Sequence, residues 1–262
     1  MFSQTSFKIG TFFGIPVKAD FSLLLVAGMF VFGYASPAVS VANALVAGLL
    51  SFAALMLSIF AHEAGHAFAA TLFGCRVNEI TLMFFGGYAS ISAMPRAPLR
   101  QAAISAAGPA TGFLLVLAAG RLAPLFALRE LSFLLSEVAR MSLWLSVFNL
   151  IPAIPLDGGN IFRAVLTHFK GRAYATQVTC RVAKWLAVAM GIYGLLGRGG
   201  LFFILLAFFV GAAAHRELEQ AARGTDGDID DIDDDVVIIS PPPGGDKNEY
   251  TRIRHPGGDR FR

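Results

Sequence analysis

Long apolar stretches separated by short polar segments constrain this chain more than any other feature of its sequence. Several of them approach or exceed the roughly 20 residues that a helix needs to cross the hydrocarbon core of a bilayer. Hydrophobic residues make up 55% of the 262 residues and charged residues only 15%, against about a quarter in soluble domains. We therefore predict an all-α polytopic membrane protein with about six transmembrane helices. The expected spans are residues 20–36, 41–73, 102–120, 133–151, 178–197 and 200–214.

The basic residues are distributed unevenly between the segments that join these spans. With the N-terminus inside, most Lys and Arg residues fall on the inner side, and only Arg121, Arg129, Arg140 and Arg198 fall on the outer side. Because positive charge is retained in the cytoplasm, we expect a multi-pass protein of the cell membrane with both termini cytoplasmic. The basic residues form no patch and the net charge is only +3, so nucleic acid is not an expected partner.

The second expected span contains the ionisable run His62-Glu63-Ala64-Gly65-His66. Four residues apart on a helix, His62 and His66 lie on one face and can bind one metal ion. Glu63 follows the first of them directly, where it can reach a metal-bound water and act as a general base. Zn²⁺ accepts such ligands and lowers the pKa of its water to about 7. The alternative is a pair of structural histidines, but ionisable groups inside a span are costly and indicate function.

Asp157 is the best candidate for a third metal ligand. Of the 11 aspartates, nine lie at residue 226 or later, and only Asp20 and Asp157 belong to the body of the chain. Asp20 stands at the start of the first span, where a helix cap is the simpler role. Asp157 follows two prolines and precedes Gly158 and Gly159, which allow sharp turns of the backbone. A turn aspartate is the alternative. Other ionisable side chains are interpreted as loop, interface or tail groups: His168, His215, His255, Glu79, Glu130 and Glu137.

Residues 75–95, CRVNEITLMFFGGYASISAMP, interrupt the helical pattern. Val, Ile, Thr, Phe and Tyr around a Gly-Gly pair predict two short strands with a turn. Non-helical backbone at membrane depth must line a protein interior or a wet cavity, so a hairpin there would face an internal site. An ordinary surface loop is the alternative. The first twenty residues are expected to form a short strand or an interfacial segment.

The composition changes after residue 223, to GTDGDIDDIDDDVVIISPPPGGDKNEYTRIRHPGGDRFR. An acidic run followed by Pro and Gly has too little apolar surface to build a core. We expect residues 1–223 to form the transmembrane core and residues 224–262 a disordered cytoplasmic tail. The tail is interpreted as a self-repelling linker, with a docking site for a partner as the alternative.

Two motifs together resemble the site-2 protease family of intramembrane zinc metalloproteases. HEAGH resembles the family's HExxH, and NLIPAIPLDGG at 149–159 resembles its second signature. FGG at 85–87 and AAGP at 106–109 extend the likeness over most of residues 1–215. No segment is long enough for a PDZ domain, and the tail cannot hold a pair of CBS domains, so the chain resembles a minimal form of the family.

The resemblance implies a role for each matching residue. His62, His66 and Asp157 would be the zinc ligands, and Glu63 the base that activates water and protonates the leaving amine. Asn149 would hold the substrate backbone or its oxyanion, with a helix-end hydrogen bond as the alternative. The hairpin at Gly86 and Gly87 would resemble the family's membrane-reentrant strand, whose edge pairs with an unwound substrate.

These observations predict a zinc endopeptidase that cuts transmembrane or juxtamembrane segments of membrane proteins. Its expected partners are the lipid bilayer and a membrane-embedded protein substrate, and a regulatory partner protein or a homo-oligomer stays open. A membrane metal-ion transporter that uses the same His and Asp residues is the first alternative. A non-catalytic adaptor is the second, although an adaptor would not need Glu63.

Overall fold

The computed structural model describes residues 6–84, 86–197, 200–222, 236–238 and 252–254. The chain divides into two compact units, Met1–Glu217 and Leu218–Arg262. In the second unit, strands β5 (Val236–Ile238) and β6 (Arg252–Arg254) pair in antiparallel orientation. Apart from these strands, the predicted disorder of residues 224–262 lies outside the described residues.

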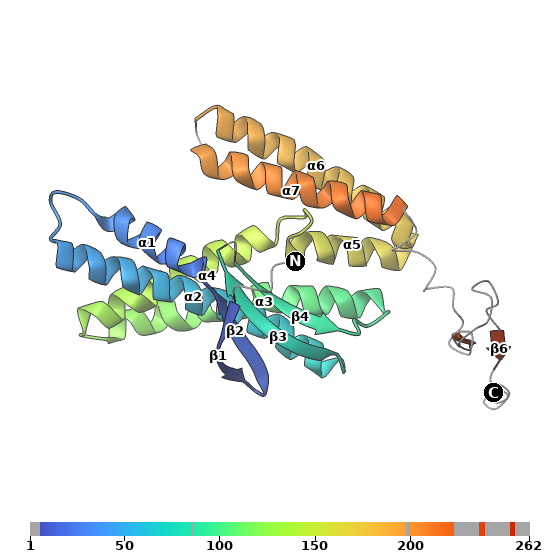
Figure 1. Ribbon diagram of the computed structural model, residues 1–262, viewed down its shortest axis with the longest axis horizontal. Helices are drawn as coiled ribbons and strands as arrows, with labels where there is room; N and C mark the ends of the chain where they lie inside the picture. Colours follow the sequence, from blue (N-terminus) through green and yellow to red (C-terminus); the bar gives the residue numbers. More distant parts are fainter. Residues whose placement is uncertain (1–5, 85, 198–199, 223–235, 239–251, 255–262) are drawn as a thin grey trace, which may run out of the picture. The chain divides into compact units, whose positions relative to one another are not determined.

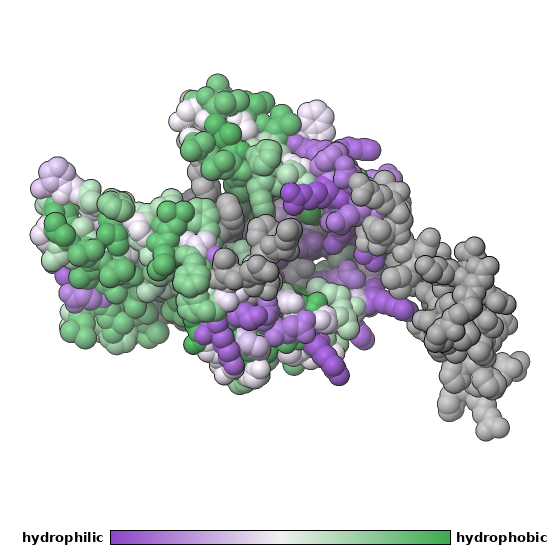
Figure 2. All heavy atoms as spheres, in the orientation of Figure 1, coloured by the Kyte–Doolittle hydropathy of each residue, from purple (hydrophilic) through white to green (hydrophobic). Residues whose placement is uncertain are grey.

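Seven α-helices account for most of the described chain (Figure 1). Four of them are long and apolar enough to cross a membrane: α2, α3, α4 and α6. Large apolar side chains on α1 and α2 face outward, among them Phe32 and Leu24 at 79% and 71% exposure (Figure 2). Such a surface is suited to lipid rather than water. The helices are α1 (Leu23–Tyr34), α2 (Val41–Leu72), α3 (Pro98–Leu122), α4 (Arg129–Asn149), α5 (Asp157–Lys170), α6 (Arg172–Leu195) and α7 (Gly200–Ala222).

Several helix boundaries differ from the expected spans. Helix α4 begins at Arg129 and α6 at Arg172, a few residues before the apolar stretches at 133 and 178. The early turns carry charge, because a helix continues into the polar interface beyond the hydrocarbon core. Helix α5 was not predicted at all, since its 14 residues follow a Pro- and Gly-rich segment and are too few to span a bilayer.

The predicted hairpin forms half of a four-stranded sheet, so an all-α fold class with one small hairpin understates the β-structure. Its order is β1 (Ser6–Phe12), β2 (Ile15–Asp20), β3 (Arg76–Met83) and β4 (Gly86–Ser92). The predicted hairpin at 75–95 is present as β3 and β4. The N-terminal segment adds two strands, through parallel pairing of Val17 in β2 with Ile80 in β3. The Gly-Gly pair opens β4 and does not form the turn.

The sheet packs on α2 (Figure 1). Ile80 and Leu82 of β3 are buried against Ile59 and Ala67 of α2. Strand β4 stands at one edge of the sheet, so one side of its backbone has no strand partner among the described residues. Asp20, at the end of β2, accepts a hydrogen bond of 2.8 Å from the backbone N–H of Ser22. Ser22 is itself the N-cap residue of α1, and this helix has no side-chain cap hydrogen bond, so the expected capping role of Asp20 is wrong.

Helices α2, α3 and α4 form the centre of the bundle. Ala54 of α2 and Val138 of α4 share one buried cluster with α3. One turn further along both helices, the hydroxyl of Ser142 donates to the hydroxyl of Ser58 at 2.9 Å. The residue numbers of the contacting pairs increase along both α2 and α4, so these two helices run in the same direction.

Candidate metal centre

Helix α2 places His62, Glu63 and His66 in the interior of the protein. Their exposures are 3%, 9% and 8%. The spacing of four residues puts the two imidazoles on one helix face, one turn apart. A buried group of this polarity within an apolar helix needs partners from other elements.

The third member of the group, Asp157, is the first residue of α5. The preceding loop packs directly on the first turn of this helix. A Cβ atom at Gly158 would lie 2.3 Å from the Leu150 carbonyl oxygen, and one at Gly159 would lie 2.5 Å from the Ala153 carbonyl carbon. Only glycine fits at these two positions, and this close packing fixes the start of α5 and with it the Asp157 carboxylate.

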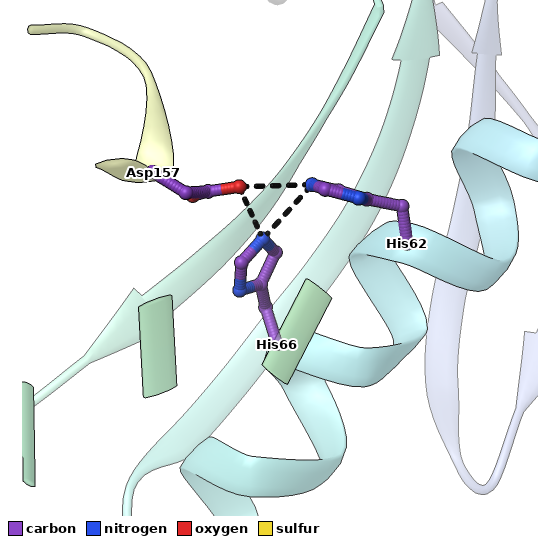
Figure 3. Close-up of side chains that lie close together, drawn as sticks. All are labelled: His62, His66 and Asp157. Atoms are coloured by element: carbon purple, nitrogen blue, oxygen red, sulfur yellow. Dashed lines mark hydrogen bonds and ion pairs between the residues drawn. The ribbon is translucent and has the colours of Figure 1, made fainter. Parts of the chain in front are cut away.

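Three ligand atoms from α2 and α5 converge on one point (Figure 3). The Oδ2 atom of Asp157 lies 2.9 Å from Nε2 of His62 and 3.2 Å from Nε2 of His66. The two Nε2 atoms are 3.2 Å apart. Ligand atoms of a tetrahedral zinc ion stand at similar separations, because each lies about 2.0–2.2 Å from the metal.

The hydrogen bonds of His66 orient its lone pair toward this point. Its Nδ1 atom lies 2.8 Å from the carbonyl oxygen of Ile104. A carbonyl only accepts, so Nδ1 carries the hydrogen, and the neutral form of the ring then has its lone pair on Nε2. A second interaction of this kind is usual for metal-binding histidines.

Space for a cation is left by Gly108 of α3. A Cβ atom at this position would lie 2.2 Å from Nε2 of His66 and 2.8 Å from Nε2 of His62. Any larger residue would therefore occupy the point on which the ligand atoms converge. The donor set of two imidazoles and one carboxylate, together with this free space, fits Zn²⁺ with an open fourth position.

The charge at Asp157 fits a cation as well. Burial of Asp157 favours its neutral form, but the contacts with His62 and His66 outweigh this effect and hold the pKa of Asp157 below its usual value. A cation held between these ligand atoms would favour the ionised carboxylate in the same way.

A cavity of about 340 Å³ opens beside the cluster. Glu63 lies on its wall, and β4 runs across it: a Cβ atom at Gly87 would be 2.8 Å from Cγ of Glu63. The backbone N–H of Ala89 also donates a hydrogen bond to the Glu63 carboxylate. The cavity is lined by Ile59, His62, Glu63, His66, Gly86, Gly87, Tyr88, Ala89, Ile91, Met94, Ile104, Ser105, Leu145, Asn149, Pro155, Asp157 and Asn160.

The structure brings all of the candidate site residues to this cavity, including Asn149, Gly86 and Gly87. The side-chain amide of Asn149 donates to the Leu145 carbonyl at 3.0 Å, so the helix-end hydrogen bond considered for it is present. Sequence reasoning missed Ala89 and the partner carbonyl of Ile104. Gly108 was noted only as part of the AAGP motif, which gave no sign of a contact with the histidines.

Comparisons with known proteins agree with this site. The sequence pattern of peptidase family M50 matches residues 50–128 and 124–192. Protein sll0528 of Synechocystis sp. is 31% identical over 80% of this chain and 59% of its own length. Zinc metalloprotease MJ0392 of Methanocaldococcus jannaschii is 29% identical over 81% of this chain and 60% of its own length. The chain thus spans about three fifths of the length of these curated relatives.

The solved structure of the site-2 protease from Methanocaldococcus jannaschii is similar in fold and sequence. It superposes with a TM-score of 0.61 at 29% identity and covers 81% of this chain and 94% of that chain. The resemblance carried by HEAGH and NLIPAIPLDGG is confirmed, and the transporter alternative gains no support. The apolar helices, the converging donor set and the matched residues lead to one conclusion: this chain is an integral membrane protein that belongs to peptidase family M50.

Proposed function

We propose that this chain is an intramembrane zinc endopeptidase that cleaves transmembrane or juxtamembrane segments of other membrane proteins. The observation that carries the proposal is the convergence of His62, His66 and Asp157 within 4.8 Å of one another, beside a cavity that Glu63 lines. Such a donor set with a neighbouring carboxylate is what metal-assisted hydrolysis of a peptide bond requires.

Each residue has a distinct role in this proposal. His62, His66 and Asp157 hold the metal. A zinc ion bound there supplies Lewis acidity and lowers the pKa of water to about 7. Glu63 faces the same cavity, takes a proton from the attacking water and passes it to the amine that leaves. The apolar walls restrict bulk water, which strengthens the electrostatic interactions inside the site.

The substrate is proposed to bind as an extended strand along β4. A peptide bond inside a helix is shielded, so the segment to be cut must unwind before water can attack it. Strand β4 offers an edge, and its residues Gly86 and Gly87 have no side chains to block a chain lying next to Glu63. Asn149, which also lines the cavity, is proposed to hold the substrate backbone. In this arrangement β3 and β4 would re-enter the membrane.

The arrangement in the membrane follows from the distribution of charge. We propose six spans, with α1 and α7 added to the four long apolar helices, and both termini in the cytoplasm of a cell-membrane protein. The metal ligands then lie in the inner half of α2 and near the cytoplasmic end of α4. Residues 224–262 are proposed to form a cytoplasmic tail outside the catalytic core.

Co-expression with tagged single-span membrane proteins tests the activity. Wild type should release a shortened fragment, whereas uncut substrate should accumulate with Glu63→Gln and with Asp157→Asn. Asp20→Asn is the matched control, because Asp20 is the other aspartate of the body and does not line the cavity. If both site variants cleave as well as wild type, the proposed function is wrong.

A further inference from the structure

The two histidines of the cluster differ in the hydrogen bond made by the ring nitrogen that faces away from it. Nδ1 of His66 is bonded to the Ile104 carbonyl. Nδ1 of His62 is fully buried and has no hydrogen-bond partner among the described residues. If Nε2 of His62 holds a metal, Nδ1 must carry a hydrogen, and a buried N–H without an acceptor costs about 1–3 kcal/mol. An acceptor for His62 is therefore needed.

Ser146 of α4 is the best-placed group to supply it. Its hydroxyl oxygen is also fully buried and without a partner in the described part of the chain. Two other buried hydroxyls also lack a hydrogen-bond partner among the described residues, those of Thr176 and Thr179 in α6. Helix α4 packs directly on α2, whereas α6 packs on α5.

The register between α2 and α4 brings Ser146 to the level of His62. Ala54 clusters with Val138, and four residues later Ser58 is bonded to Ser142 at 2.9 Å. Because the two helices run in the same direction, one further turn on each leads from Ser58 to His62 and from Ser142 to Ser146.

Contacts with α3 place both groups at the same three-helix junction. A Cβ atom at Gly108 would lie 2.8 Å from Nε2 of His62, and one at Gly112 would lie 2.0 Å from the hydroxyl oxygen of Ser146. Gly108 and Gly112 are one turn apart on one face of α3. His62 and Ser146 thus approach this face from two different helices.

We propose that Ser146 is a positioning residue for the metal centre. The hydrogen of His62 Nδ1 is donated to one buried water molecule, which donates in turn to the Ser146 hydroxyl oxygen, and this keeps the lone pair of His62 on Nε2. A buried water makes about three hydrogen bonds to polar groups of this kind. The proposal rests on the metal site of the proposed function and adds to it the residue that orients the first ligand.

Zinc affinity of the purified full-length chain in detergent tests this role. Loss of an outer partner of a metal-binding histidine lowers metal affinity by about 10–100-fold, and we expect a loss of that size for Ser146→Ala in competition with a chelator. Ser142→Ala is the matched control: it removes the hydroxyl one turn earlier, which is bonded to Ser58 and not to His62, and should leave zinc affinity unchanged.

A spectroscopic measurement separates positioning from general loosening of the bundle. With Co²⁺ in place of zinc, the visible absorption of Ser146→Ala should differ from that of wild type, while that of Ser142→Ala should not. Thermal unfolding of both metal-free variants shows whether each one folds. Equal zinc affinity and equal Co²⁺ spectra for Ser146→Ala and wild type would overturn the role of Ser146 and leave the proposed function standing. A wild-type chain that binds no zinc would overturn both.

Discussion

Two glutamates are buried in the helical bundle to almost the same extent but have different surroundings. Glu63 of α2 is 9% exposed and Glu137 of α4 is 8% exposed. The Glu137 carboxylate accepts hydrogen bonds from the guanidinium of Arg140, one turn away on the same helix, at 3.1 Å from Nε and at closer range from the terminal nitrogen. Glu63 forms no ion pair with Lys or Arg in the described part of the chain and instead faces the cavity, His62 and His66.

The difference teaches that a buried carboxylate in an apolar helix is not by itself a sign of catalysis. Glu137 is neutralised by a residue of its own helix, so its charge is balanced locally and is unavailable to a ligand. Glu63 has a backbone N–H from β4 and two imidazoles around it, and its charge is directed at the space where a substrate would lie. Neighbours, and not burial, distinguish the two.

The largest expected effect is a difference in cleavage rate between variants of the two glutamates. Glu63→Gln removes the proposed base and should lower the cleavage rate by about 10²–10⁴-fold. Glu137→Gln keeps the site intact and should cleave at close to the wild-type rate, because Glu137 does not line the cavity. Cleavage of a transmembrane substrate by the purified variants in liposomes measures both. Similar losses for the two variants would contradict the distinction.

The second prediction concerns metal binding, which should depend on the neighbours of Glu63 and not on Glu137. Asp157→Asn removes a charged ligand and should weaken zinc binding by more than the roughly 10–100-fold typical of outer-shell changes. Glu63→Gln and Glu137→Gln should retain zinc. Chelator competition on the purified variants ranks their zinc affinities. Wild-type affinity in Asp157→Asn would argue against Asp157 as a ligand.

The third prediction compares the free energies of unfolding of variants at the two partners of the Glu137–Arg140 ion pair. Arg140→Ala leaves the Glu137 carboxylate buried without a cation, which costs about 1–3 kcal/mol. Glu137→Gln should cost less, because the Arg140 side chain is 51% exposed and can find other partners. Denaturant unfolding in detergent micelles tests this order. A larger loss for Glu137→Gln would show that the pair is not the reason for burial of Glu137.

The smallest expected effect is on the metal-free protein. Glu63→Gln replaces a buried carboxyl group by an amide that still accepts from the Ala89 amide, so stability should change by less than about 1 kcal/mol. Glu137→Gln breaks a charge-assisted pair and should be the more destabilising of the two. Thermal unfolding after removal of zinc compares them, and the opposite order would mean that Glu63 contributes to folding as Glu137 does.

Local patterns predicted the three residues whose ligand atoms converge. The helical spacing of His62 and His66 needs only the period of one helix, and Asp157 was found because almost every other aspartate lies in the tail. Helix α5 escaped prediction because Gly158 and Gly159, which usually end helices, here allow close packing at its start.

The remaining features depend on contacts between segments that are distant in the chain. Parallel pairing of Val17 with Ile80 joins the N-terminal strands to the predicted hairpin, and no local periodicity encodes such a pairing. The space left by Gly108 beside His66 is likewise a property of two helices together. The same is true of Glu137, which the sequence left as an unremarkable interface charge and which the structure pairs with Arg140.

X-ray absorption at the zinc edge tests the central claim most directly. Purified Glu63→Gln is the best sample, because it should keep the metal without turning over. We expect only nitrogen and oxygen ligands at about 2.0–2.2 Å, with scattering from imidazole rings that is reduced in His62→Ala. A sulfur ligand at about 2.3 Å, which only a cysteine or methionine could provide, or a chain that holds no zinc at all, would contradict a metal centre built from His62, His66 and Asp157.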